Sequence, residues 1–111
     1  MDKWKEYLDS LDELKQNMVL EVMSMAAIVI PNPERVMSYG VPTIKSGGRP
    51  IIAVAANKNH FSVYPFGGAA IEANLSLLKD LDYSKGTIRF PYDNLPEKKL
   101  IEAIVKYNLS K

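Results

Sequence analysis

The chain of 111 residues is long enough for one domain with a single core, and its content of 47 % hydrophobic and 24 % charged residues is typical of a globular protein. The net charge of +1 does not favour nucleic acid as a partner, because nucleic-acid-binding proteins are usually strongly basic. The absence of cysteine excludes disulfides, thiolate nucleophiles and cysteine-ligated metal centres. We therefore expect one domain over residues 1–111, in the cytoplasm.

The first thirty residues have the apolar spacing of two helices. Asp2 can cap a short first helix, and residues 10–13 match a capping box that opens the second. Pro31 and Pro33 end the second helix, because proline cannot donate an amide hydrogen. Residues 18–30 are too few to span a bilayer, which needs about 20 apolar residues, and the segment before them is acidic rather than basic. We expect neither a membrane span nor a secretory signal. The predicted buried stripe consists of Leu11, Leu14, Met18, Val22, Met25 and Val29.

The middle of the chain has the alternation and the glycine turns of β-strands. Gly47 and Gly48 can form a tight hairpin between two strands, and the apolar residues 50–56 indicate a central strand. The strands are expected to pair as consecutive antiparallel neighbours. Their predicted positions are residues 36–40, 43–45, 50–56, 60–65 and, after a turn at 83–86, 87–91.

Two further helices are predicted after the first four strands. Residues 69–81 place Ile71, Leu75 and Leu78 on one face, and a helix capped by Asn94 follows the last strand. The buried stripe of this last helix is expected to be Leu100, Ile101, Ile104 and Val105. The order of elements indicates an α+β fold, in which the N-terminal and C-terminal helices cover one face of an antiparallel sheet of four or five strands.

The uncovered face of this sheet is the place where polar side chains should gather. His60 is the only histidine, and strand periodicity places it with Ser62 and Tyr64, opposite Phe61 and Val63. The same periodicity turns Thr87 and Arg89 outward in the last strand, while Ile88 and Phe90 point inward. No carboxylate occurs between Glu34 and Glu72, so this face should attract an anion. The alternative is that its basic side chains are solvated and only protect the edges of the sheet.

Four carboxylates lie close together near the N-terminus. Glu6, Asp9, Asp12 and Glu13 could supply oxygen ligands to ferrous iron, manganese or calcium at an open site. The alternative is that they stabilise the N-termini of the first two helices through the helix dipole. No metalloprotease motif, Ser-His-Asp order or pair of inward carboxylates occurs, so the sequence favours a non-enzymatic domain.

Four strings resemble the YdhG-like family, a domain of unknown function whose members include a frataxin-like intracellular iron chaperone. They are MSYGVPTIK at 37–45, AANKNHFSVYP at 55–65, AIEA at 70–73 and SKGTIRFP at 84–91. The resemblance implies a frataxin-like α+β fold, a cytosolic setting and delivery of iron to iron–sulfur or haem assembly proteins. Family motif positions fall on Tyr39, Gly40, Pro42, Lys58, Asn59, His60, Tyr64, Pro65, Lys85, Gly86 and Arg89.

The sequence therefore leaves three hypotheses for function. The first is an iron chaperone that binds ferrous iron weakly through Glu6, Asp9, Asp12 and Glu13. The second is a binding module for an anionic small molecule, and the third is an interaction domain for a protein partner. The ligand-binding residues of the second hypothesis are Tyr39, Lys58, Asn59, His60, Tyr64, Lys85 and Arg89.

Overall fold

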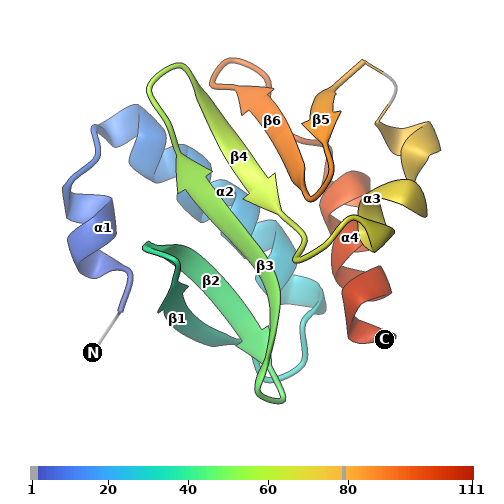
Figure 1. Ribbon diagram of the computed structural model, residues 1–111. Coiled ribbons are helices and arrows are strands. Elements are labelled where there is room, and N and C mark those ends of the chain that lie inside the picture. The colour runs from blue at the N-terminus through green and yellow to red at the C-terminus, as the bar shows by residue number, and fades with distance from the viewer. Residues whose placement is uncertain (1–2, 79) are drawn as a thin grey trace.

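A six-stranded antiparallel sheet forms one layer of the molecule, and helices α2 and α4 form the other (Figure 1). The structure is a computed structural model that describes residues 3–78 and 80–111. The elements are α1 (Lys5–Asp9), α2 (Glu13–Val29), β1 (Glu34–Ser38), β2 (Val41–Ser46), β3 (Arg49–Ala56), β4 (His60–Tyr64), α3 (Ala69–Glu72), the 3-10 helix η1 (Leu75–Leu77), β5 (Asp82–Ser84), β6 (Thr87–Pro91) and α4 (Lys98–Leu109).

The strand order β1-β2-β3-β4-β6-β5 confirms the predicted meander and the central position of residues 50–56. Strand β6 pairs with β4 in the register Ser62 to Arg89 and Phe61 to Phe90. The expected number of four or five strands was too low by one. The additional strand, β5, lies at the edge of the sheet and overlaps the turn predicted at residues 83–86. All three of its residues are exposed, so it has no apolar alternation to read.

The core lies between the sheet and the two long helices. Phe61 and Phe90 stack across β4 and β6 with ring centroids 5.3 Å apart, on the face that α2 and α4 cover. The predicted stripe of α4 is buried in full. Trp4 is also buried and donates a hydrogen bond of 2.8 Å from Nε1 to the carbonyl of Val36, which fixes the segment before α1 against the edge strand. None of the helices in the described residues is long and apolar enough to cross a membrane.

The buried stripe of α2 differs from the prediction. Leu14 is 54 % exposed, whereas Val19, Met23 and Ala26 are buried together with the predicted Val22. Residues 18–30 are apolar almost all round the helix, so spacing alone does not select which face turns to the sheet. The prediction identified the helix correctly. Apart from Leu14, the other members of the predicted stripe pack against the core in part, namely Leu11, Met18, Met25 and Val29, but the fully buried centre of the face is displaced to Val19, Met23 and Ala26 beside Val22.

The predicted caps were also displaced. Asp12, not Ser10, caps α2 by accepting a hydrogen bond of 2.9 Å from the amide of Lys15. Ser10 instead ends α1. At α4 the cap position is Glu97 rather than Asn94, because Pro96 disfavours the helical conformation at the residue before it. The predicted cap at Asp2 lies outside the described residues.

The predicted helix over residues 69–81 is broken into α3 and η1. In a continuing α-helix the carbonyl of Ala70 would accept from the backbone amide of Asn74. Here the side chain of Asn74 donates to that carbonyl at 2.8 Å, and its backbone amide bonds to Ile71. The side chain thus replaces the helical hydrogen bond, and Leu75 is left 49 % exposed while Ile71 and Leu78 are buried as expected. Lys79, within the predicted helix, lies outside the described residues.

Candidate functional site

The face of the sheet opposite α2 and α4 carries small, polar and aromatic side chains. No helix crosses this open face over β2 to β4 (Figure 1). Directly paired residues of antiparallel strands share a face, so Thr43, Ala53 and Tyr64 form one row across β2, β3 and β4. Ser62 and Arg89 belong to the next row. The small side chains are buried among larger neighbours, and Ala53 is only 2 % exposed.

A pocket of about 410 Å³ lies on this open face. Its floor is Ala53, and its aromatic walls come from three separate segments: the β1–β2 turn, strand β4 and the loop after β4. Pockets of roughly 300–1,000 Å³ with largely apolar walls are typical of small-molecule sites. None of the residues that line it is charged. They are Ser38, Tyr39, Val41, Ala53, Tyr64, Phe66 and Gly86.

Two of the aromatic wall residues have a left-handed backbone. Tyr39 and Phe66 both have φ of 53°, a conformation that costs a residue with a Cβ about 1 kcal/mol or more. Tyr39 and Gly40 are the two central residues of the β1–β2 hairpin, and Gly40 also has a positive φ, as a two-residue primed turn requires. The side chain of Tyr39 is 94 % exposed, so packing does not account for a tyrosine at this position.

A hydrogen-bond network occupies the other end of β4. Asn57 donates from Nδ2 to Ser62 Oγ at 3.0 Å, and the same nitrogen lies 3.3 Å from His60 Nε2. Because Nδ2 is a donor, this second contact is a hydrogen bond only when His60 Nε2 is the acceptor. The carbonyl of Asn57 accepts from the Tyr92 hydroxyl at 2.5 Å. Asn57 therefore fixes His60 and Ser62 relative to the β3–β4 turn.

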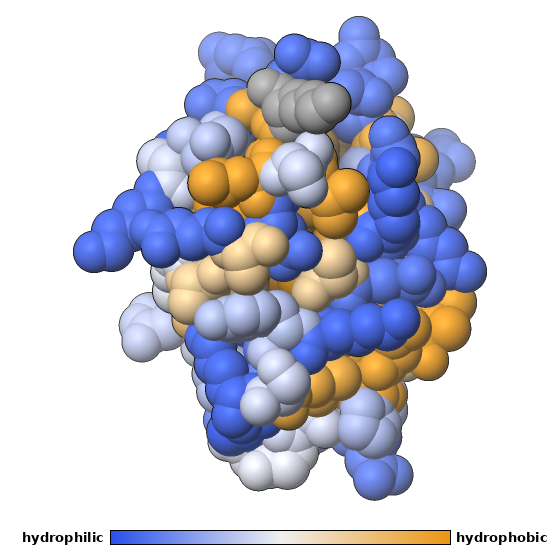
Figure 2. All heavy atoms as spheres, turned by 90° about the vertical axis from the view of Figure 1, so that its right-hand side faces the viewer, coloured by the Kyte–Doolittle hydropathy of each residue, from blue (hydrophilic) through white to orange (hydrophobic). Residues whose placement is uncertain are grey.

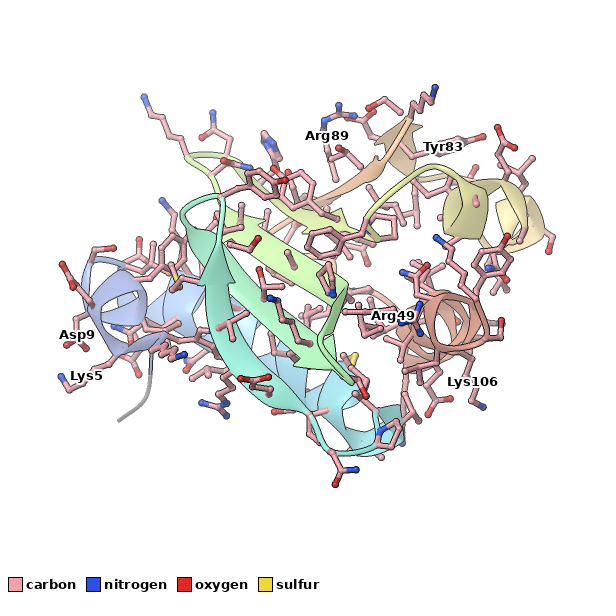
Figure 3. The ribbon with its side chains drawn as sticks, turned by 60° about the horizontal axis from the view of Figure 1, so that its bottom comes forward. Lys5, Asp9, Arg49, Tyr83, Arg89 and Lys106 are labelled. Atoms are coloured by element: carbon pink, nitrogen blue, oxygen red, sulfur yellow. The ribbon has the colours of Figure 1, made fainter. Side chains whose placement is uncertain are left out.

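The two cations nearest strand β5, Arg89 and Lys85, have different surroundings on the open face. Arg89 donates to Asp82 Oδ1 at 3.2 Å and to Ser84 Oγ at 2.8 Å, so its guanidinium is held against the edge strand β5. Arg89 and Tyr83 are labelled at this edge in Figure 3. Lys85 lies in the β5–β6 turn beside Gly86. A Cβ placed on Gly68 would be 3.3 Å from Lys85 Cγ, so the lysine stem passes directly over this glycine.

The seven predicted ligand-binding residues are thus divided along the open face. Tyr39 and Tyr64 line the pocket, and Lys85 adjoins it through Gly86. At the opposite end of β4, Lys58 and Asn59 are exposed in the β3–β4 turn and His60 begins the strand. Arg89 lies between the two groups, in the row of Ser62.

Sequence reasoning missed several residues of this face. Phe66 follows Pro65 and precedes two glycines, a turn signal that could have drawn attention to it. Asn57 lies between the strands predicted at 50–56 and 60–65, and nothing in the sequence indicates its contacts with His60 and Ser62. Ala53 could not have been found as a pocket floor, because its role depends on which side chains flank it across the sheet.

The four N-terminal carboxylates lie on α1 and at the start of α2. Asp9 pairs with Lys5 at 2.6 Å on the exposed side of α1, and both point outward at that end of the molecule (Figure 3). Asp12 caps α2, and Glu6 and Glu13 are exposed. Over residues 3–78 and 80–111, no three carboxylate or imidazole side chains are grouped so that they could hold a metal ion.

A second hollow, of about 350 Å³, lies between η1 and the start of α4. Figure 2 shows the side of the molecule formed by α3, η1 and α4, where apolar residues lie among charged ones. Leu77, Leu95 and Leu100 line the hollow together with Asp80 and Glu97. None of the predicted site residues contributes to it.

No family model matches the chain. It is 24 % identical to the intracellular iron chaperone frataxin of Bacillus subtilis (strain 168), over 98 % of this chain and 90 % of the relative. A crystal structure of YdhG, a protein of the DUF1801 family from Bacillus subtilis, superimposes with a TM-score of 0.88 at 25 % identity, over 99 % of this chain and 90 % of that one. The predicted YdhG-like resemblance and fold class are confirmed: the chain is a small α+β domain that is similar in fold and sequence to YdhG of the DUF1801 family.

Proposed function

We propose that this domain is a non-enzymatic cytoplasmic binding module that holds an anionic small molecule on its open sheet face. The observation that carries the proposal is the pocket of about 410 Å³, in which aromatic side chains surround a floor of small residues. A sheet face left without helices and yet hollowed in this way offers contact area that the fold itself does not use.

The charge of the face supports an anion as the ligand. The pocket lining contains no carboxylate, and none occurs between Glu34 and Glu72. Around it the face carries Lys85 and Arg89, with Lys58 and His60 at its far end, and cations of this kind form charge-assisted hydrogen bonds with carboxylate and phosphate. The proposed binding face consists of Tyr39, Lys58, Asn59, His60, Tyr64, Lys85 and Arg89.

Binding is favoured over catalysis by the hydrogen bonds of the one serine beside the histidine. Ser62 Oγ accepts from Asn57 Nδ2 and, among the described residues, donates no hydrogen bond to His60, and Ser62 is only 2 % exposed. A serine nucleophile needs a base that takes its proton and access to the substrate. The Ser62 hydroxyl has neither a hydrogen-bonded base among the described residues nor open access to a substrate.

The experiment is a nuclear magnetic resonance screen of small carboxylates and phosphates against the isotope-labelled chain. A ligand should shift the amide signals of pocket residues, and Ala53→Leu should abolish its binding by filling the pocket from the floor. Ala73→Leu makes the same change at an exposed position outside the pocket and should leave binding intact. If no anion shifts the pocket signals, the proposal is wrong.

Ferrous iron is the second candidate ligand, supported by the similarity to a protein named as an iron chaperone. The proposed ligands are Glu6, Asp9, Asp12 and Glu13, and the proposed partners are iron–sulfur or haem assembly proteins. An anaerobic titration with Fe²⁺ should then broaden amide signals between residues 6 and 16. Replacing all four acids by amides should remove that broadening, and binding that survives the replacement would reject this ligand set.

A further inference from the structure

The composition of the pocket walls restricts the shape of a ligand. Tyr39, Tyr64 and Phe66 approach the pocket from three different segments, and the floor beneath them is the methyl group of Ala53. Aromatic side chains interact most favourably with other flat rings, in offset-stacked or edge-to-face arrangements. A flat ring system would contact these walls over more of its surface than a flexible chain would.

The exposure and backbone conformation of Tyr39 also support a flat ring system as the ligand. Its ring is almost fully exposed, and its hydroxyl has no hydrogen-bond partner among the described residues. Its left-handed backbone would be adopted more readily by asparagine or glycine. The tyrosine therefore contributes nothing to the free fold that a turn residue would not, and its ring is available to cover a ligand at the pocket mouth.

The cations that neighbour the pocket restrict the charge of the ligand. The guanidinium of Arg89 is already bonded to Asp82 and Ser84. The ammonium of Lys85 has no carboxylate within 4.0 Å in the described part of the chain, and its stem is steered over Gly68 beside the Phe66 loop. Aromatic pockets elsewhere hold quaternary ammonium groups. Here the lysine next to the lining residue Gly86 has no carboxylate partner and the lining has no acids, and both features oppose a cation.

We infer that the ligand of this pocket is an aromatic carboxylate, with its ring between Tyr39, Tyr64 and Phe66 and its carboxylate at Lys85. The inference rests on the proposed function and deepens it. It assigns the anion contact to Lys85 rather than to Arg89, Lys58 or His60, and it assigns the affinity for the ring to the aromatic walls.

Three probes that share one ring and differ in charge test this directly: naphthoate, naphthamide and naphthylmethyl-trimethylammonium. Each is titrated into the labelled chain, and the dissociation constant is taken from the pocket signals. Naphthoate should bind tightest. Lys85→Gln should weaken naphthoate by about tenfold, the factor that about 1.4 kcal/mol represents, and leave naphthamide unchanged. Tyr39→Ala should weaken naphthoate and naphthamide alike.

The controls separate this inference from the proposed function. Lys106→Gln removes an exposed lysine of α4 (Figure 3) and should change neither constant. Tighter binding of the trimethylammonium probe, or a loss on Lys58→Gln that exceeds the loss on Lys85→Gln, would overturn the inference. If phosphates or aliphatic carboxylates shift the pocket signals and naphthoate does not, the aromatic class is wrong and the proposed function stands. If no anion shifts them, both fail.

Discussion

Asn108 is the buried polar residue that connects the end of α4 to the sheet and to the pocket loop. It is 3 % exposed, and its Nδ2 donates to the carbonyls of Ile51 at 2.9 Å and Pro65 at 2.7 Å. Asn108→Ala would leave both carbonyls buried without a donor. Each such group costs about 1–3 kcal/mol, so we expect a loss of about 3 kcal/mol in the free energy of unfolding, measured by urea denaturation.

The control for this prediction is Asn59→Ala, which removes an exposed amide and should change stability by less than about 0.5 kcal/mol. Because Phe66 follows Pro65, loss of the Asn108 contact should also shift the amide signals of the pocket loop. A fully stable Asn108→Ala variant would mean that water satisfies both carbonyls. Asn108 Oδ1 is buried without a partner among the described residues, and no signal in the sequence indicates this.

Tyr92 gives the fold a pH dependence in alkaline solution. Burial raises the pKa of its hydroxyl above the ordinary value of 10.0, with a further contribution from Tyr7. A group whose folded-state pKa is raised contributes stability that is present below its unfolded pKa and is lost as the pH rises through the folded pKa. Stability should therefore fall above about pH 10. Tyr92→Phe should fall less over the same range, and equal slopes would contradict the prediction.

At the scale of elements, the β1–β2 hairpin holds Tyr39 in an unfavourable backbone conformation and places it at the pocket wall. Tyr39 has a left-handed backbone there, which asparagine tolerates better than tyrosine. Tyr39→Asn should raise the free energy of unfolding by about 1 kcal/mol, while it removes one wall of the pocket. Tyr39→Phe keeps the same backbone demand and should leave stability unchanged. Destabilisation by Tyr39→Asn would show that the ring contributes to the free fold.

All the strands except β5 were predictable because each has a local signal. Gly47 and Gly48 set one hairpin, and the alternation around Phe61 and Val63 fixed which side chains point inward. The helices were less predictable in detail. The rotation of α2 depends on the sheet that it packs against, and the break before η1 depends on one side chain of Asn74 replacing a backbone donor. The first is a tertiary effect and the second is a competing local hydrogen bond, and hydrophobic periodicity indicates neither.

For the candidate site, the sequence predicted the face but not the pocket. Strand period alone placed His60, Tyr64 and Arg89 on one face, and the register of β4 with β6 agrees. Which of the cations are already hydrogen-bonded could be seen only in the structure. Arg89 is engaged by Asp82 and Ser84, and these residues form a strand that the sequence did not reveal.

At the scale of the whole molecule, the pocket is formed partly by the buried central strand of the sheet and partly by turns at the surface. Its floor belongs to β3, a central strand that is buried along most of its length and contacts α2 and α4. Apart from Tyr64 of β4, its walls come from the Tyr39 turn, the Phe66 loop and the β5–β6 turn at Gly86. Tyr39 is exposed, and Phe66 and Gly86 are only half-buried. Local opening costs least where buried contacts are few.

Hydrogen exchange should therefore separate the central strands of the sheet from its edge and from the pocket loops. Amides of β3 and β4 should exchange only through global unfolding, whereas those of β5, η1 and the three wall segments should exchange through smaller openings. A ligand that bridges the walls should slow exchange at every amide whose opening releases it, which includes the wall segments and the strands that exchange through global unfolding. The amides of η1, which does not line the pocket, should exchange at an unchanged rate. Slowing at η1 equal to that at the walls would mean that these segments open only together with the whole fold.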